Sequence, residues 1–337
     1  MSVLYHLPTL PPKLPKAEAI TQEITALKDH FGGEEIYVNP NQQSPLYVPR
    51  LLFGFQKLKE LGRREDNFQL HHFYNPDPFP FFYLRFLKRP VVYSISCGLN
   101  DKRPNIGFLA SMGAVAASDK RSYERLKSWG LENVFLVKPG IDTSRFTHSP
   151  LPLNNEIRLM VGSAPWTQGQ FQSKGVDALL EAALQSPHLH LVFLWRGVLV
   201  DEMEQRVRQM GLGNQVTLIH QFVDVNSVLA TVHASVALVT NSAILKSYPH
   251  SLLDSLAAGK PVLISRTIPM ADYVEETGCG VVAENVTPAD IIGAVEALKE
   301  NYGQLQGAAK QIGQRDFSHQ KMIASFETVY NYALSKK

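Results

Sequence analysis

The sequence predicts an α/β protein of two domains, each built on a doubly wound parallel sheet. Its 337 residues exceed one ordinary domain, which holds roughly 100–200 residues. Hydrophobic residues make up 45% and charged residues 19% of the chain, as in a globular protein with a buried core. In the second half, short apolar strands alternate with amphipathic helices, a pattern typical of a parallel sheet covered on both faces.

The second half predicts strands and helices in strict alternation. The strands are short apolar runs: Ile157–Val161, His190–Leu194, Val216–His220, Ser235–Val239, Pro261–Ser265 and Val281–Val282. The helices have apolar residues at helical spacing: Lys174–Gln185, Asp201–Met210, Val225–His233, His250–Ala258, Pro269–Thr277 and Pro288–Glu300. Gly211, Gly259 and Gly278 follow three of these helices, as left-handed C-terminal residues do. Gly162–Ser173 is expected to be a polar loop.

The first half is less regular and predicts a second, smaller α/β domain. Its strand candidates are Val3–His6, Glu35–Val38, Phe68–His72, Val91–Ser96, Ala114–Ala117 and Val134–Val137. Its helix candidates are Ala17–Phe31, Val48–Leu61 and Arg121–Trp129. The polar, proline-containing stretch Thr147–Asn155 is expected to link the two domains.

Composition and charge exclude several classes of protein. Cys97 and Cys279 are too few for a disulfide framework or a four-cysteine zinc site, and a reducing cytosol is expected. Residues 1–150 carry 19 Lys/Arg and 14 Asp/Glu, a net +5, and residues 151–337 carry 14 and 17, a net −3. This asymmetry is far from the basic footprint of a nucleic-acid-binding protein. No apolar run reaches the roughly 18 residues of a membrane span, and the N-terminus lacks the layout of a signal peptide.

The motif scan excludes several kinds of site. No G-x-G-x-x-G follows a strand, and Gly259-Lys260 is followed by proline, so neither a dinucleotide loop nor a P-loop is present. The eleven histidines show no metal-ligand spacing. His71 and His72 are neighbours in a predicted strand and are expected to point to opposite faces of its sheet. Two open α/β domains nevertheless imply a ligand at the carboxyl ends of their strands.

Four segments, taken in chain order, resemble a known family: Val134–Phe146, Lys174-Gly175, Lys246–Ser265 and Asp316–Leu334. They are similar to retaining glycosyltransferases of the GT-B fold, glycosyltransferase family four, also described as glycosyl transferases group 1. The third segment is the most specific, because a generic α/β domain does not need its order of turn, helix, Ala-Gly and strand.

The resemblance implies two Rossmann-like domains that face a cleft. Residues 1–148 would bind the acceptor, residues 149–316 would bind the nucleotide sugar, and the helix in residues 317–337 would cross back onto the first domain. The donor would be a UDP- or GDP-sugar, with no metal or other cofactor required. The acceptor would be a hydroxyl group of a glycan, a lipid-linked glycan or a small molecule. Such an enzyme would work in polysaccharide biosynthesis, in the cytoplasm or at the inner face of the membrane.

Charge stabilisation on the donor side would fall to a few residues. Negative charge develops on the leaving diphosphate, and a cation or N–H groups at a helix N-terminus can stabilise it. Lys174 is expected to be that cation, at the start of a helix. The family usually has an arginine directly after Gly162, where this chain has Ser163. Asp254 matches the second glutamate of the family's Glu-x7-Glu motif, which binds the ribose hydroxyls. Lys246 replaces the first glutamate, and it would pair with a phosphate or a donor-sugar carboxylate, or else face solvent.

The resemblance also assigns neighbouring loops to the donor. The loop before the predicted helix His250–Ala258, together with the first turn of that helix, would contact the diphosphate. These residues are Ser247, Tyr248, His250, Ser251 and Leu252. Phe222 or Val223, after the third strand of the second domain, would pack on the base. The alternative for these two residues is a buried turn.

The match to the family is thinner on the acceptor side. The loop after the first strand has no glycine, but Lys13 and Lys16 could meet anions there. Ser96 stands where the family tends to have a histidine, and with Lys174 and Lys246 it is a candidate catalytic residue. Further acceptor-side candidates lie at or after strand ends: His72, Asp77 and Asn100. A buried core histidine is the alternative for His72.

Three alternatives stay open. Phe79–Pro90 mixes aromatic and basic residues, which is compatible with a basic amphipathic helix on an anionic membrane or with a core-packed helix that has a basic end. The departures at Ser163, Lys246 and Ser96 also fit a catalytically inactive relative that binds or scaffolds in polysaccharide assembly. A sugar-nucleotide epimerase of the same fold fits the C-terminal segments less well.

Overall fold

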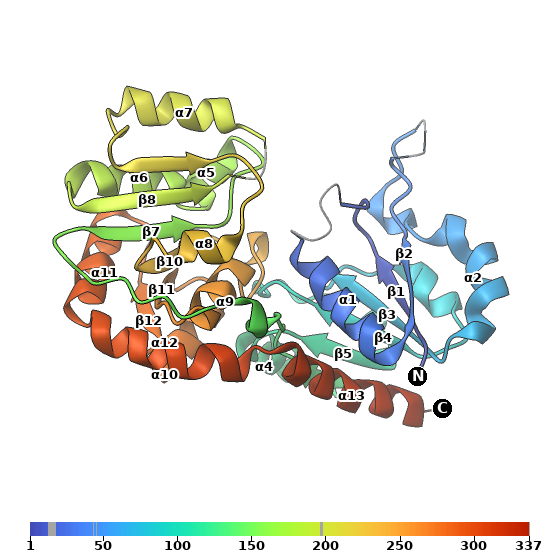
Figure 1. The fold of residues 1–337 in the computed structure, drawn as a ribbon. Coiled ribbons are helices and arrows are strands. Elements are labelled where there is room, and N and C mark those ends of the chain that lie inside the picture. The colour runs from blue at the N-terminus through green and yellow to red at the C-terminus, as the bar shows by residue number, and fades with distance from the viewer. Residues whose placement is uncertain (13–17, 43, 45, 196–197, 337) are drawn as a thin grey trace. The chain divides into compact units, whose positions relative to one another are not determined.

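The structure is a computed structural model that describes residues 1–12, 18–42, 44, 46–195 and 198–336. Lys13 and Lys16, predicted on the acceptor side, lie outside these residues. The chain divides into two compact units: unit 1 is Met1–Ile141 with His319–Lys337, and unit 2 is Asp142–Ser318. Each unit is a sheet with helices on both of its faces (Figure 1).

Unit 1 is built on a six-stranded parallel sheet with the order β2-β1-β3-β4-β5-β6. Its strands are β1 (Val3–Leu7), β2 (Gly33–Tyr37), β3 (Leu70–Asn75), β4 (Val91–Ile95), β5 (Ala114–Ala117) and β6 (Val134–Leu136). Its helices are α1 (Ala19–Phe31), α2 (Leu58–Arg64), α3 (Ile106–Ala110), α4 (Lys120–Ser128) and α13 (His319–Ser335). Helices α1 and α13 cover one face of the sheet, and α2, α3 and α4 cover the other.

The segment Val48–Leu61 is not the single helix that its apolar spacing predicts. It forms two 3₁₀ turns, η2 (Arg50–Leu52) and η3 (Phe55–Lys57), before α2 begins. Gly54 lies between them with φ = 86°, a left-handed conformation that ends any α-helix. A Cβ atom at Gly54 would lie 2.3 Å from the Tyr83 ring, so the chain turns where it packs on that ring.

A buried hydrogen-bond chain crosses the α2-facing side of this sheet. The Glu65 carboxylate only accepts, so the His71 Nε2–H donates to it over 3.1 Å. His71 Nδ1 then accepts from the His6 Nε2–H over 2.9 Å, and His6 Nδ1 accepts from the Tyr83 hydroxyl over 2.8 Å. Burial holds the pKa of both histidines below the usual range, which keeps the rings neutral. The chain fixes strands β1 and β3 to the segments that cover them.

Unit 2 is built on a second six-stranded parallel sheet with the order β12-β11-β10-β7-β8-β9. Its strands are β7 (Ile157–Val161), β8 (Leu189–Leu194), β9 (Val216–Ile219), β10 (Ala234–Ala237), β11 (Val262–Ser265) and β12 (Gly280–Ala283). Its helices are α5 (Gly169–Ser173), α6 (Val176–Gln185), α7 (Val200–Gln209), α8 (Val225–Leu229), α9 (His250–Ala257), α10 (Met270–Thr277), α11 (Pro288–Glu300) and α12 (Tyr302–Asp316). Helices α6 and α11 pack into the core on one face, and α9 and α10 contact β10, β11 and β12.

The expected polar loop Gly162–Ser173 ends in a helical turn, α5. Its Phe171 is buried, with its ring centroid 5.8 Å from that of the buried Trp195. The Arg206 guanidinium lies 4.1 Å from the centroid of the same Phe171 ring. One buried aromatic residue thus anchors a segment whose other residues are mostly polar.

Two further features of unit 2 depend on glycine. Helix α6 begins at Val176 rather than Lys174, because Gly175 precedes it with φ = 66°. Helix α12, which the sequence analysis did not predict, packs on α9 at Gly313. A Cβ atom at Gly313 would lie 1.8 Å from the Leu256 carbonyl oxygen, so no larger residue fits this contact.

Both strand orders reverse beside the first strand of the sheet, between β1 and β3 in unit 1 and between β7 and β10 in unit 2. Open α/β sheets bind ligands outside the carboxyl ends of the strands at such a switch point. The edge in unit 1 follows Leu7 and Asn75, and the edge in unit 2 follows Val161 and Ala237. The fold therefore predicts one ligand-binding edge in each unit.

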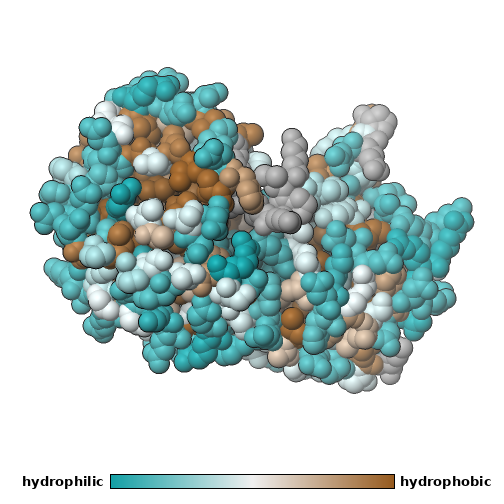
Figure 2. Space-filling model, viewed as in Figure 1, coloured by the Kyte–Doolittle hydropathy of each residue, from teal (hydrophilic) through white to brown (hydrophobic). Residues whose placement is uncertain are grey.

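The surface of the molecule is mixed in hydropathy. On the face of unit 2 seen in Figure 2, hydrophobic residues gather over β7 and β8, and the adjoining α7 is hydrophilic. No helix in the described part of the chain has the length and apolar character that a membrane span requires.

Candidate active site

The switch point of unit 2 brings Gly162 against Ser251. Gly162 directly follows β7, and Ser251 is the second residue of α9. A Cβ atom at Gly162 would lie 2.5 Å from the Ser251 Cβ, closer than two carbon atoms can approach without displacement. Only glycine therefore lets the loop after β7 reach the N-terminus of α9. A helix N-terminus offers unpaired N–H groups and a positive dipole end to an anion.

Lys174 lies between α5 and α6 with only 8% of its surface exposed. Its Nζ donates to Ser163 Oγ over 3.1 Å and to the Ala164 carbonyl over 2.8 Å, both in the loop after β7. The backbone N–H of Thr240, beyond β10, donates to the Ser173 carbonyl over 2.9 Å and ties this loop to the switch point. The prediction that a helix begins at Lys174 is wrong, because α6 begins at Val176. The Lys174 ammonium group nevertheless lies at the ligand-binding edge.

Burial changes the acid–base behaviour of Lys174. Desolvation lowers the pKa of its amino group from 10.5 to about 8. The two hydrogen bonds hold the group toward Ser163 and Ala164. The site therefore presents an ammonium group that an anionic ligand would keep protonated.

The loop into α9 is less available to a ligand than predicted. Ser247 is fully buried, and the Tyr248 ring packs against Tyr273 and Phe317 in the core. These two side chains are therefore corrected from donor contacts to core residues. The backbone N–H of Leu252 already donates to the Pro249 carbonyl, and its side chain is fully buried.

The remaining donor-side candidates of α9 stay at the surface. His250 and Ser251, the first two residues of the helix, are half-buried. Asp254 is also half-buried and lies three residues after Ser251, so the two side chains are neighbours on one helix face. Lys246 is half-buried and follows the 3₁₀ turn η7 (Ser242–Ile244).

Two exposed aromatic residues occupy loops at the carboxyl edge of the unit 2 sheet. Phe222, after β9, is 65% exposed, and Val223 is half-buried. The alternative of a buried turn residue is therefore wrong for Phe222. Trp166, in the loop after β7, is 58% exposed. The sequence analysis missed Trp166, although a tryptophan between polar residues in a loop is a usable signal.

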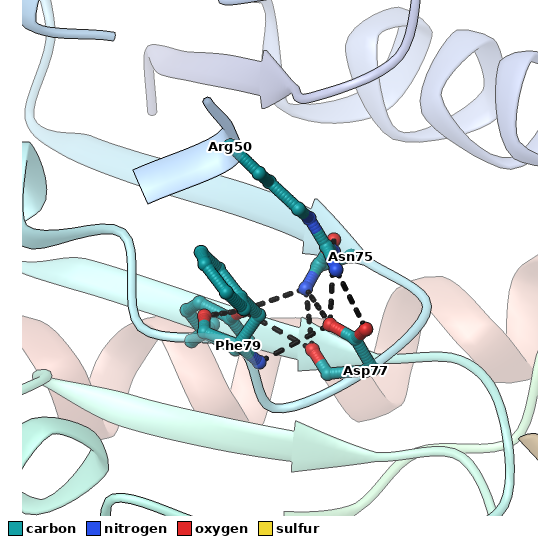
Figure 3. Close-up of polar contacts among 5 residues, drawn as sticks. Arg50, Asn75, Asp77 and Phe79 are labelled. Atoms are coloured by element: carbon teal, nitrogen blue, oxygen red, sulfur yellow. Dashed lines mark hydrogen bonds and ion pairs between the residues drawn. The ribbon is translucent and has the colours of Figure 1, made fainter. Parts of the chain in front are cut away.

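The switch point of unit 1 contains a polar cluster at the end of β3 (Figure 3). Arg50 donates to both carboxylate oxygens of Asp77, over 2.7 and 2.9 Å, and to Asn75 Oδ1 over 2.8 Å. Its guanidinium also lies 4.5 Å from the centroid of the Phe79 ring. Asp77 is thus held by Arg50, which the sequence analysis did not single out. Their pairing joins residues 27 positions apart, and no local pattern signals it.

Ser96 follows β4 beside this cluster. Its backbone N–H donates to the Asn75 carbonyl over 3.0 Å. Its hydroxyl group is buried, and the described residues offer it no hydrogen-bond partner. An unpartnered buried hydroxyl at this edge is consistent with a role toward a ligand. Asn100 is exposed, and its side chain accepts from the Lys102 N–H over 3.0 Å within its own loop.

His72 is not an acceptor-side residue. It is fully buried, with Nδ1 2.6 Å from the Tyr330 hydroxyl on α13 and Nε2 2.7 Å from Ser94 Oγ. Burial lowers its pKa to about 3, so the ring is neutral. His71 makes its contacts with His6 and Glu65 instead. The two neighbouring histidines thus have separate sets of partners.

The segment Phe79–Pro90 does not form an amphipathic α-helix. It contains a five-residue 3₁₀ helix, η5 (Phe82–Phe86), in which Tyr83 and Leu84 are buried. Phe81 is also buried, and Phe86 is exposed. The core-packed alternative therefore describes most of this segment.

Comparisons with known proteins agree with this architecture. A model of the family described as glycosyl transferases group 1 matches residues 146–316, half of the chain. No curated protein matches the chain in sequence.

Several solved structures have the same fold. The chain is similar to HepE of Anabaena, solved in complex with UDP and glucose, with 14% identity, a TM-score of 0.71 and coverage of 98% of this chain and 99% of that one. It is similar to a glycosyltransferase from Rickettsia africae, with 12% identity, a TM-score of 0.74 and coverage of 100% and 99%. It is also similar to the sucrose-phosphate synthase of Thermosynechococcus elongatus, with 13% identity, a TM-score of 0.73 and full coverage of both chains.

The two parallel six-stranded sheets with their helices are the GT-B fold, shared with these structures. The matched residues 146–316 include the loop after β7, Lys174 and all of α9. The chain therefore belongs to the glycosyl transferases group 1 family.

Proposed function

We propose that the protein is a retaining, metal-independent glycosyltransferase of family four. It transfers a sugar from a UDP- or GDP-sugar to a hydroxyl group of a glycan or lipid-linked glycan, in the cytoplasm, during polysaccharide biosynthesis. The observation that carries this proposal is the buried Lys174 ammonium, held 3.1 Å from Ser163 Oγ at the switch point of unit 2. The UDP bound to the similar HepE structure supports a uridine nucleotide as the first donor to test.

Lys174 stabilises the charge of the leaving diphosphate. The ammonium group exchanges its bonds to the loop for bonds to phosphate oxygens, which are stronger because both partners are charged. The N-terminus of α9, adjoining through Gly162 and Ser251, adds N–H donors and its dipole. Asp254 accepts hydrogen bonds from the ribose hydroxyls, and Phe222 covers the base.

The reaction exchanges one C–O bond for another. The bond between the anomeric carbon and the β-phosphate oxygen breaks, and its electron pair leaves with the diphosphate. The acceptor oxygen bonds to the same face of the anomeric carbon, so the configuration is retained. The acceptor proton passes to the departing phosphate oxygen, which requires no protein base.

Lys246 makes this site differ from the family pattern. A lysine cannot accept hydrogen bonds from sugar hydroxyls as the replaced glutamate does. It can pair with a carboxylate, so a uronic-acid donor belongs in the test beside neutral sugars.

The test begins with binding. Titration calorimetry of the full chain with UDP, GDP, UDP-glucose, UDP-glucuronic acid and GDP-mannose should give a measurable dissociation constant for one base. Proton NMR of the sugar released by slow donor hydrolysis should then show the donor's own anomer first. Release of the opposite anomer would overturn retention. Nucleotide binding without turnover against glycan acceptors would favour the non-catalytic alternative, and failure of every nucleotide to bind would overturn the proposal.

A further inference from the structure

Three buried hydrogen-bond donors at the amino end of the unit 2 sheet have no acceptor among the described residues. These atoms, here named the amino-edge cluster, are Lys260 Nζ, Arg158 Nε and Ser235 Oγ. The Lys260 and Ser235 side chains are fully buried, and Arg158 is half-buried. Buried polar groups of folded proteins are hydrogen-bonded in the great majority of cases, so donors that gather without an acceptor indicate a ligand that accepts.

The strand register brings the amino-edge cluster together. Strand β10 lies between β7 and β11. Carried back from Ser235, the register of these strands aligns Arg158, His233 and Lys260 in one row, and the His233 N–H donates to the Arg158 carbonyl over 2.8 Å. Neighbouring strands lie about 4.8 Å apart, so the backbones of Arg158 and Lys260 flank His233 about 10 Å apart. Ser235, two residues after His233, lies on the same face of the middle strand.

The amino-edge cluster faces away from the core that α6 and α11 share with the sheet. Leu159, Ala234 and Leu263, which alternate with the cluster residues along the strands, belong to that core. Pro261 favours an extended backbone at Lys260, so the alternation of the strand continues to this residue. The cluster therefore lies on the opposite face, where α9 contacts β10 and β11.

Little negative charge offsets the two cations of the cluster. Burial lowers the pKa of Lys260 to about 8, with no opposing contribution from a described carboxylate. Burial also lowers the pKa of His233, and the charges of Lys260 and Arg158 lower it further, which places both cations near that ring. Glu156 is the carboxylate that acts on His233, but its side chain is 51% exposed and lies 3.7 Å from His190. The missing acceptor is therefore an anion rather than a water molecule.

His233 is not that acceptor, although it lies between the two cations. Its Nδ1 accepts from the backbone N–H of Arg158 over 3.0 Å. Its Nε2–H then donates to the Pro152 carbonyl over 3.3 Å. Both ring nitrogens are thus occupied in the neutral ring, and neither can accept from a cation of the cluster.

We propose that the amino-edge cluster binds a chloride ion. The ion accepts from the Lys260 ammonium group, the Arg158 Nε–H and the Ser235 hydroxyl group, and its charge offsets that of the buried lysine. Because all three atoms are closed to solvent, a small monovalent ion fits better than phosphate, whose higher charge costs more to bury. The site lies at the opposite edge of the sheet from Lys174, so it is separate from the proposed transferase reaction.

The test is chlorine-35 NMR of the full chain at pH 7 in sodium chloride, with no nucleotide present. Chloride that exchanges with an asymmetric protein site gives a broadened line, and sodium bromide should reverse this broadening by competition. Lys260→Met should abolish the broadening. Ser235→Ala should weaken chloride affinity at least about tenfold, because one donor to a charged partner is lost.

Two control variants separate the cluster from other lysines. Lys174→Met removes the buried lysine at the other edge of the sheet, and Lys310→Met removes an exposed lysine of α12. Both should keep the broadening of the unaltered chain, and every variant should keep its circular dichroism spectrum. Loss of the broadening in Lys174→Met but not in Lys260→Met would place the ion elsewhere and overturn the proposal.

Urea unfolding gives a second measurement that does not depend on exchange rates. Chloride at ten times the dissociation constant from NMR should raise the ratio of folded to unfolded chain about 11-fold over the same concentration of sodium gluconate. Lys260→Met, which buries no charge, should give the same ratio in both salts. An equal response of the unaltered chain to the two salts, or an equal chloride response of the variant, would overturn the proposal.

Discussion

Replacement of Lys174 should remove the pH dependence of nucleotide binding. The pKa of its amino group in the free protein is about 8, so about nine-tenths of the molecules carry the charge at pH 7 and about one-tenth at pH 9. With a second pKa of about 6, the terminal phosphate of UDP is about nine-tenths ionised at pH 7 and more at higher pH, so its own titration adds little to the fall. If the ammonium form alone binds the phosphate strongly, affinity for UDP should fall about tenfold from pH 7 to pH 9, roughly 1.4 kcal/mol.

Titration calorimetry of UDP at half-unit steps from pH 6.5 to 9.5 would measure this profile. Lys174→Met should bind UDP more weakly at pH 7, by roughly 1.5–3 kcal/mol for one charged hydrogen-bond donor, and its profile should be flat. Lys174→Arg should also be flat, because arginine stays protonated. Lys260→Met is the matched control, since burial also lowers the pKa of Lys260 to about 8, but this residue precedes β11 at the opposite edge of the sheet. A Lys174→Met protein with the wild-type profile would refute the assignment.

Three further changes test particular contacts. Gly162→Ala should weaken UDP binding at least about tenfold and destabilise unit 2 by roughly 1–3 kcal/mol, and a second change, Ser251→Gly, should restore both in calorimetry and urea unfolding. Tyr330→Phe should cost roughly 1–3 kcal/mol in urea unfolding, because His72 loses a buried hydrogen-bond partner; an unchanged midpoint would contradict that bond. Lys260→Met should raise the free energy of unfolding at pH 7 by up to about 3 kcal/mol, because the unfolded chain keeps the lysine proton to about pH 10.5 and the folded chain loses it near 8. This advantage should shrink as the pH rises from 8 to 10.5, and a constant difference would argue against the burial cost.

The sequence predicted the α/β fold class because both sheets are buried on two faces. In strands such as Ile157–Val161 and Val91–Ile95, four of the five residues are apolar, a composition typical of a parallel strand covered on both faces. Glycine positions were informative for a similar reason. Gly259 and Gly278 follow α9 and α10 with φ of 70° and 63°, a conformation that favours glycine over other residues.

Exposure could not be predicted in the same way. The apolar spacing of Val48–Leu61 resembles that of a core-facing helix, but Leu51 and Leu52 are exposed, and Gly54 turns the chain between them and α2. Helical periodicity shows which residues share a face of a helix, but it does not show whether that face packs on the protein core or is exposed to solvent. The prediction of a helix over Val48–Leu61 therefore gave no sign that Leu51 and Leu52 are exposed.

Side-chain partners at the candidate site were also beyond the sequence. Lys174 directly follows α5, and the Phe171 of α5 packs against Trp195 and Arg206, which follow it by 24 and 35 positions. The pairing of Arg50 with Asp77 likewise depends on how two loops meet at the end of β3. Contacts between side chains that are distant in the sequence form only in the folded chain, so local sequence patterns do not predict them.

The place of α13 has a consequence for biosynthesis. Residues 319–335 complete unit 1, yet the ribosome makes them only after all of unit 2, which is one continuous stretch. Until then the sheet face formed in part by Val92, Ala114 and Ala116 lacks its cover of Phe326 and Tyr330. Unit 2 can therefore reach its native state first, although it is encoded second. A nascent chain stalled before residue 319 should expose this apolar sheet face and bind chaperones through it. Deletion of α13 should therefore destabilise unit 1, whose other residues are Met1–Ile141.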